Sequence, residues 1–168
     1  PVLQLSKLPE MDIIYLEYRG PYHKMSKQLE FFRDTIRKAS LSSDHPEISI
    51  TYDNPQTTQE SECRAIVGQR ITKNEKYEKF VRENPAFKLT KLLESKSLES
   101  KFPFRGRLSY IAADLKVSVV FSQGFEQDFR EYKDPENRYP ITRIYEANTI
   151  TFACPVSSGR DSFFLMEQ

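Results

Sequence analysis

A tyrosine closes each of two β-strands that the sequence predicts, and an arginine accompanies the second tyrosine. Tyr52 ends the first strand and Tyr145 stands near the end of the second. Arg143 lies two residues before Tyr145, so the two side chains should share one face of the strand, with Glu146 on the opposite face. Phenol and guanidinium groups can orient a bound molecule, whereas arginine cannot act as a base near neutral pH. The pattern therefore favours binding over proton abstraction.

Six aromatic side chains, together with Arg143, are candidates for the lining of a ligand cleft. Aromatic faces offer broad apolar contact, and phenol groups add a few orienting hydrogen bonds. The alternative, that these side chains only pack two sheets together, stays open for each of them. The predicted ligand-binding residues are Tyr18, Tyr22, Tyr52, Phe104, Tyr110, Arg143 and Tyr145.

Two arginines also have a structural interpretation. A salt bridge from Arg143 to Glu17 or Glu62 is at least as good an explanation as a ligand contact. Arg64, which follows Cys63, is typical of a residue that closes a structural ion pair.

The residues that most often hold metals are few and scattered. His23 and His45 belong to no cluster with metal-ligand spacing, and both are expected at the surface. Cys63 and Cys154 are interpreted as buried thiols that behave as small hydrophobes. No Ser/His/Asp order and no glycine-rich phosphate loop occurs. The sequence therefore predicts neither a metal site nor a cofactor.

The amino-acid composition argues against several classes of binding partner. The 168 residues are 38% hydrophobic with a net charge of +1, so no global field would hold nucleic acid or an anionic membrane. Two cysteines argue against a disulfide framework and fit the reducing cytoplasm. No apolar run approaches the roughly 20 residues of a membrane span. Because the sequence opens with Pro1, an upstream anchor that holds the domain at the ER could have been removed.

Periodicity predicts alternating strands and helices. Residues 23–40 place apolar side chains three and four positions apart, which is the spacing of one helix face. A second helix is expected at 73–83, a third at 108–115, and a helical piece around Phe125, Phe129 and Tyr132. Residues 87–93 fit strand or helix. Strands are predicted at 12–19, 48–52, 62–71, 98–104, 141–146 and 149–154.

The two halves of the chain repeat one order of elements. Tyr52 is matched with Tyr145, and Cys63 with Cys154, as corresponding positions. Each half reads strand–helix–strand–strand, a unit too small to bury both faces alone. The predicted fold is therefore a single α+β domain of two βαββ repeats about a pseudo-twofold axis, with helices outside and a central cleft where the other faces meet. Repeat one covers about 12–71, a connector 72–96, repeat two about 97–155 and a tail 156–168.

Several short segments form a motif set. They are Tyr-Arg-Gly-Pro-Tyr at 18–22, Tyr-Asp-Asn-Pro at 52–55, Cys-Arg-Ala-Ile-Val-Gly at 63–68, Phe-Pro-Phe at 102–104 and Phe-Ala-Cys-Pro at 152–155. Together they resemble the GyrI-like family of small-molecule-binding domains, over nearly the whole chain. Within that family the set is most similar to the cytosolic domain of an ER-phagy receptor of animals.

The resemblance implies two SHS2-type βαββ repeats around a cleft for a hydrophobic small molecule. Some bacterial members are drug-binding regulatory domains, some bind gyrase and some hydrolyse strained electrophiles such as cyclopropanoids. The receptor is an adaptor, which makes a protein partner the second candidate. Ligand-binding and hydrolytic members carry a cleft glutamate two residues before the second tyrosine, where this chain has Arg143. We therefore expect a non-catalytic ligand-binding or adaptor module.

Two alternatives remain. A hydrolase would use Tyr52 and Tyr145 with an acid supplied by Glu62, Glu146 or Glu17, and it would need a carboxylate whose pKa is raised by apolar neighbours. A haem binder of the SOUL type, which is similar in architecture, ranks last because the chain has only two histidines.

Overall fold

The structure is a computed structural model of the chain, and it describes residues 3–103 and 139–156. The expected helices at 108–115 and around Phe125 to Tyr132 lie outside these residues. The described elements are β1 (Gln4–Leu8), β2 (Met11–Arg19), α1 (Ser26–Lys38), β3 (Glu47–Thr51), β4 (Arg64–Ile71), α2 (Glu75–Glu83), β5 (Phe87–Leu92), β6 (Ser95–Pro103), β7 (Ile141–Tyr145) and β8 (Thr149–Pro155). Single 3₁₀ turns lie at Tyr22–Lys24 and Glu60–Glu62.

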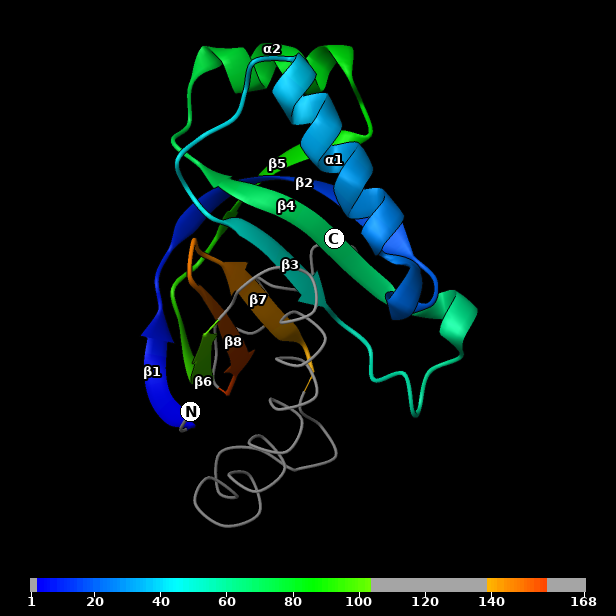
Figure 1. Cartoon of the computed structure of the whole chain (residues 1–168), viewed down its shortest axis with the longest axis vertical. Coiled ribbons are helices and arrows are strands. Elements are labelled where there is room, and N and C mark those ends of the chain that lie inside the picture. Colours follow the sequence, from blue (N-terminus) through cyan, green and yellow to red (C-terminus); the bar gives the residue numbers. More distant parts are fainter. Residues whose placement is uncertain (1–2, 104–138, 157–168) are drawn as a thin grey trace.

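All eight strands join one antiparallel sheet in the order β1-β6-β8-β7-β3-β4-β2-β5 (Figure 1). The order is symmetric about the β3–β7 pair, so β2, β4 and β3 correspond to β6, β8 and β7. Strands β2 and β6 both have nine residues, and β3 and β7 both have five. The predicted mixed α+β fold is confirmed, and the halves meet edge to edge through β3 and β7.

The chain runs from β1 into β2 and from β5 into β6 as two long, bent strands, and their pairing links the halves a second time. The register in which β1 pairs with β6 continues without a shift into the pairing of β2 with β5: Leu8 lies opposite Ser95, and Met11 opposite Leu92. Strand β1 was not expected from the sequence. The segment taken as a connector contains α2 and β5, so the ambiguous residues 87–93 form a strand of the sheet.

The two helices cover the same face of the first half. The apolar stripe of α1 buries Phe32 and Ile36 against β2 and β4, and Tyr77 of α2 joins the same cluster. Helix α2 begins at Asn74, whose side chain accepts a hydrogen bond from the Lys76 backbone N–H, as N-cap residues do. Both helices predicted in this part of the chain are confirmed.

The opposite face of the sheet, here called the inner face, is mostly filled. Ile13, Ile48, Ile50 and Ile66 are at most 1% exposed and pack together with residues of both halves. The prediction that these faces meet is therefore right, but they meet in a hydrophobic core. Beside this core the inner face opens in a pocket of about 360 Å³ rather than in a wide central cleft.

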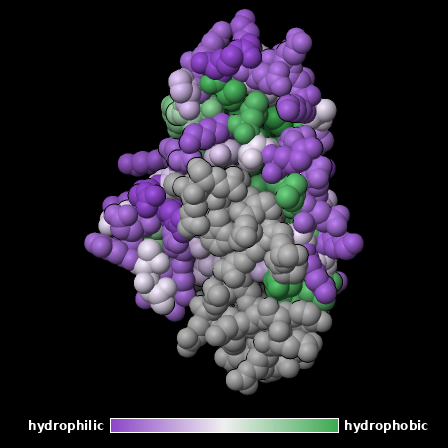
Figure 2. Space-filling model, turned by 180° about the vertical axis from the view of Figure 1, so that it is seen from behind, coloured by the Kyte–Doolittle hydropathy of each residue, from purple (hydrophilic) through white to green (hydrophobic). Residues whose placement is uncertain are grey.

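The surface is hydrophilic over most of the view from behind, with hydrophobic side chains gathered in the upper part near α2 (Figure 2). Phe31 and Leu93 are the large hydrophobic residues with substantial exposure in the described part, at 54% and 50%. Phe31 is 6.2 Å from Phe87, centroid to centroid, so it extends an aromatic cluster rather than standing alone.

Candidate ligand-binding site

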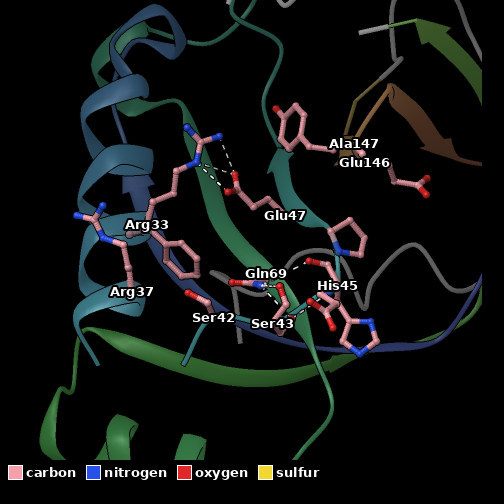
Figure 3. Close-up of a pocket in the computed structure, with 13 residues that line it drawn as sticks. Arg33, Arg37, Ser42, Ser43, His45, Glu47, Gln69, Glu146 and Ala147 are labelled. Atoms are coloured by element: carbon pink, nitrogen blue, oxygen red, sulfur yellow. Dashed lines mark hydrogen bonds and ion pairs between the residues drawn. The ribbon is translucent and has the colours of Figure 1, made fainter. Parts of the chain in front are cut away.

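A cavity of about 690 Å³ lies on the helix-covered face, at the boundary between the two halves (Figure 3). Its walls are α1, the loop at residues 42–46, the ends of β3 and β4, and the β7–β8 hairpin. The volume falls within the range of small-molecule sites. The lining residues are Phe32, Arg33, Arg37, Ser42, Ser43, Asp44, His45, Pro46, Glu47, Gln69, Tyr145, Glu146 and Ala147.

An ion pair crosses one side of the cavity. The Arg33 guanidinium reaches from α1 to Glu47 of β3, and its Nε lies 2.8 and 2.9 Å from the two carboxylate oxygens (Figure 3). A further nitrogen of Arg33 lies 2.7 Å from Glu47 Oε2. This fork geometry directs the negative charge of Glu47 towards Arg33. Glu47 is therefore committed to holding α1 against the sheet.

The loop at residues 42–46 is fixed by a buried amide. Gln69, which is 7% exposed, donates from Nε2 to Ser43 Oγ at 2.9 Å and to the Ser43 carbonyl at 3.2 Å. The His45 ring Nε2 lies 3.0 Å from Thr72 Oγ1 at the other end of the loop. The cavity floor is therefore preorganised by side chains that are already hydrogen-bonded.

Arg143 and Tyr145 lie on this same face. The Tyr145 hydroxyl is 3.0 Å from Ser49 Oγ, and Arg143 donates to Thr51 Oγ1 at 2.9 Å. Ser49 and Thr51 are two residues apart on β3, so both contacts are made on one side of the sheet. The Arg143 guanidinium also lies 5.5 Å from the centre of the Phe152 ring, within cation–π range. Tyr145 lines the cavity, and the half-buried Arg143 lies beside it on the same face of β7.

The structure does not bring Tyr52 to this site. Tyr52 is 3% exposed and lies in the inner-face core with Ile48 and Ile50, whereas Tyr145 points to the helix-covered face. The equal lengths of β3 and β7 align Tyr145 with Thr51, so the match of Tyr52 with Tyr145 is off by one residue. A shift of one position reverses the face of a strand residue.

Tyr18 and Tyr22 belong to the turn after β2. Tyr18 donates its hydroxyl hydrogen to the Pro21 carbonyl. Tyr22 donates to the Arg64 carbonyl at 2.7 Å and accepts the Asp53 backbone N–H at 3.0 Å. Burial raises the pKa of Tyr22 far above its usual value, so the phenol stays protonated. Both tyrosines have structural partners at the far end of β3 from the cavity.

Asp53 and Arg64 form the ion pair that the sequence analysis expected of Arg64. Two guanidinium nitrogens of Arg64 lie 2.9 and 2.8 Å from the Asp53 carboxylate, and the Arg64 backbone N–H donates to it at 2.8 Å. Burial alone would raise the pKa of Asp53, but the hydrogen bonds and charge of Arg64 outweigh it and hold that pKa below its usual range. The motif residues at 52–55 and 63–64 therefore build the scaffold.

The acids proposed for a hydrolase are dispersed. Glu62 pairs with Arg19 at 3.3 Å and is exposed. Glu17 pairs with Lys88 at 2.7 Å, and the ladder places it three strands from β7, about 14 Å away at the usual strand spacing. Glu146 lines the cavity, but its carboxylate points away from Arg33 and Glu47 (Figure 3). Neither expected partner of Arg143, Glu17 or Glu62, lies beside it.

The cysteines are buried and the histidines are exposed, as the sequence analysis expects. Cys63 and Cys154 are both free and buried. They do not correspond, because Cys63 precedes the first residue of β4 whereas Cys154 lies near the end of β8. His23 and His45 are exposed. Phe104 and Tyr110 lie outside the described residues, so their predicted role has no structural counterpart here.

Sequence reasoning missed the polar half of the cavity. Arg33, Glu47 and Gln69 come from three elements, and only the strand register brings Glu47 opposite both Tyr145 and Gln69. One signal was available: Glu47 precedes an apolar run, and Arg33 lies outside the apolar stripe of its helix. The arrangement offers hydrogen-bond donors, a phenol and guanidinium groups around a wide opening, which suits binding.

The described helices give no membrane span, because none combines the necessary length with apolar character. Likewise, no three potential metal ligands cluster within residues 3–103 and 139–156.

Comparison with known proteins gives a family match in the sequence and fold matches in the structure. A family model described as the GyrI-like small molecule binding domain matches residues 3–99, more than half of the chain. No significant sequence match was found among curated proteins.

Three solved structures illustrate the fold. A hydrolase encoded by lin2189 from Listeria innocua superimposes with a TM-score of 0.56 at 15% identity, over 93% of this chain and 92% of that one. SAV2435 bound to tetraphenylphosphonium gives 0.59 at 9% identity, over 93% and 94%. EcmrR in a complex with DNA gives 0.56 at 11% identity, over 93% of this chain but 57% of the longer EcmrR chain. At these identities the likeness shows a shared fold.

Proposed function

This chain belongs to the GyrI-like family of small-molecule-binding domains, and on that premise we propose that it binds a hydrophobic small molecule beside α1 without catalysing a reaction on it. One observation carries the proposal. Arg143 and Tyr145 stand side by side on the helix-covered face, next to a cavity of about 690 Å³. The family resemblance expects a glutamate where Arg143 stands, and a guanidinium cannot replace that acid as a base.

Arg143, beside the cavity, favours an anionic or neutral ligand, while the lining itself carries Arg33 and Arg37 together with the acids Asp44, Glu47 and Glu146. Glu47, the acid opposite Tyr145, is already paired with Arg33. Arg143 donates to the neutral hydroxyl of Thr51 and faces the ring of Phe152, and neither of these two contacts is with an acid. A cation would therefore meet a guanidinium where the resemblance expects a carboxylate.

Two probes of the same shape and opposite charge test this preference. We expect tetraphenylborate to bind at least tenfold more tightly than tetraphenylphosphonium, a difference of about 1.4 kcal/mol. Isothermal titration calorimetry at low ionic strength measures both dissociation constants. Arg143→Glu should reverse the order because it places an acid beside Tyr145, which lines the cavity.

A distant charge reversal separates this local effect from a change in net charge. Arg82→Glu alters an exposed residue of α2 by the same two charges and should leave the order unchanged. Tighter binding of tetraphenylphosphonium by the unaltered protein would contradict the charge preference. Binding of neither probe would remove the cavity as a hydrophobic site.

The absence of turnover is a separate expectation. Purified protein should hydrolyse cyclopropane-type and epoxide electrophiles no faster than buffer, because Glu47, Glu62 and Glu17 are paired and the carboxylate of Glu146 points away from Arg33 and Glu47. Product formation followed by liquid chromatography measures this. Hydrolysis that is lost in Tyr52→Phe or Glu146→Gln would instead support the enzyme hypothesis.

A finer proposal is that the module acts as an adaptor of the ER-phagy receptor type, on the cytosolic side of the ER. Its support is the motif set at 52–55, 63–68 and 152–155. Those residues lie in the scaffold around Asp53 and Arg64 and in β8, which any member of the family needs. The two free cysteines support a reducing compartment. An adaptor would bind its protein partner whether or not the cavity is filled.

A further inference from the structure

A second cavity, of about 360 Å³, opens on the inner face of the sheet, and we call it the inner pocket. Its apolar floor is formed by Leu8, Met11, Ile48 and Ile144, which also pack against the inner-face core. The lining also includes three cations, Lys7, Arg70 and Lys101, and two acids, Glu99 and Glu146. The sheet separates this pocket from the cavity beside α1, and Pro46 and Glu146 form the border between them.

The duplication shows that the inner face of the second half, which contributes Glu99 to the inner pocket, is more polar than packing requires. Aligning β2 with β6 from end to end places Ser97 where the first half has Ile13, and Glu99 where it has Tyr15. The same alignment of β3 with β7 places Thr142 where the first half has Ile48. The first half therefore fills its inner face with apolar side chains, while the second presents hydroxyl and carboxyl groups.

Polar groups that are buried on this face are costly, and of the three only Glu99 lines the pocket. Thr142 is fully buried, and its hydroxyl has no hydrogen-bond partner within the described residues. Glu99 is partly buried, and that burial raises the pKa of its carboxyl group, although Ser6 and Lys101 act in the opposite direction. An apolar residue at either position would avoid this cost. The second half thus keeps polar groups where the first half shows that apolar ones fit.

The charge of the inner pocket leans positive. Arg70 points to the inner face, since its ladder partner Ile13 lies in the core there, and its guanidinium has no ion pair in the described part of the chain. Lys101 lies two residues from Glu99 on the same face of β6. Lys7 has only an exposed contact with Glu94 at 3.7 Å, which is worth little.

We propose that the inner pocket binds a small amphipathic carboxylate, with its hydrocarbon part on the Leu8, Met11 and Ile48 floor and its charge met by Arg70 and Lys101. The size of the pocket, its apolar floor and its three cations against two acids together fit this class. Glu99 repels an anionic ligand, so the proposal predicts opposite effects of substitution on affinity. Neutralising Glu99 strengthens binding, whereas neutralising either cation weakens it. A site for a cation would give the reverse pattern.

Three probes, each with an eight-carbon chain, test the proposal on the full chain. We expect calorimetry to show binding of octanoate, with octyltrimethylammonium and octanol at least tenfold weaker. Arg70→Gln and Lys101→Gln should each weaken octanoate binding about fivefold or more, and Glu99→Gln should strengthen it. Lys79→Gln removes one positive charge from the exposed surface of α2 and should change nothing.

Thermal unfolding verifies that each variant is folded. If Lys101→Gln is not folded, the affinity of Arg70→Gln for octanoate alone tests the proposal. Failure to bind octanoate overturns the proposal, as does tighter binding of the ammonium probe. Octanoate binding that both cation variants retain would place it elsewhere and equally overturn it. Tetraphenylborate binding reports on the cavity beside α1 and is expected to be unchanged in Lys101→Gln, so the two sites can fail independently.

Discussion

Replacing Asp53 with alanine is expected to lower the free energy of unfolding by about 3 kcal/mol, because it leaves the guanidinium of Arg64 without its partner in a largely buried place. The side chains of the pair are only 16% and 18% exposed. The substitution removes three hydrogen bonds at once, two from the guanidinium and one from the Arg64 backbone. Urea unfolding followed by circular dichroism measures the change.

The exposed pair of Asp34 and Arg37 is the matched control. Its atoms are 3.1 Å apart but its side chains are 59% and 70% exposed, so Asp34→Ala should cost less than about 0.5 kcal/mol. The lowered pKa of Asp53 also fixes the direction in which the stability from this pair changes with pH. Because the folded pKa of Asp53 is lowered, its contribution is complete above the usual value near 4 and is lost as pH falls through the folded pKa. Equal costs for Asp53→Ala and Asp34→Ala would contradict this account.

Replacing Gly68 with alanine is expected to cost about 3 kcal/mol for a steric reason. A Cβ atom at this position would lie 2.5 Å from the Ile14 carbonyl oxygen and 2.9 Å from Tyr15 Cβ. Both obstacles belong to β2, the neighbouring central strand, so backbone atoms would have to move. The shift of the urea midpoint at unchanged slope measures the loss.

The related position in the second half supplies the control. Ala153 of β8 occupies the place that the duplication assigns to Gly68, and it carries its Cβ in the core without exposure. Ala153→Gly should cost about 1 kcal/mol, mainly through chain entropy. A Gly68→Ala variant as stable as the unaltered protein would show that β2 and β4 can separate freely.

The local pattern of the sequence predicted most of the fold. The stripe of α1, the strand at Asp12 to Arg19 and the hairpin at Ala147-Asn148 follow from side-chain spacing and turn residues, which act over a few positions. Strand β1 escaped prediction because Gln4–Leu8 alternates weakly and is defined by its distant partner β6. Long-range pairing of that kind leaves little trace in the strand itself.

The candidate site was harder to predict for the same reason. Spacing correctly put Arg143 and Tyr145 on one face, but a one-residue error in aligning the halves put Tyr52 with them. Strand register decides which face a residue occupies, and only the ladder between β3 and β7 reveals it. The same register places Glu47 and Gln69 in the cavity beside α1 and determines which residues line the inner pocket.

The bent strands described above have a consequence for how the molecule can come apart. Strand β1 leads into the first βαββ unit yet pairs within the second, and β5 leads into the second yet pairs within the first. The two units are thus exchanged at their borders, like partners in a swapped dimer joined into one chain. Cutting the chain between Leu92 and Ser95 would not release two independent modules, because the N-terminal fragment would carry away β1, the strand that pairs with β6 of the other fragment.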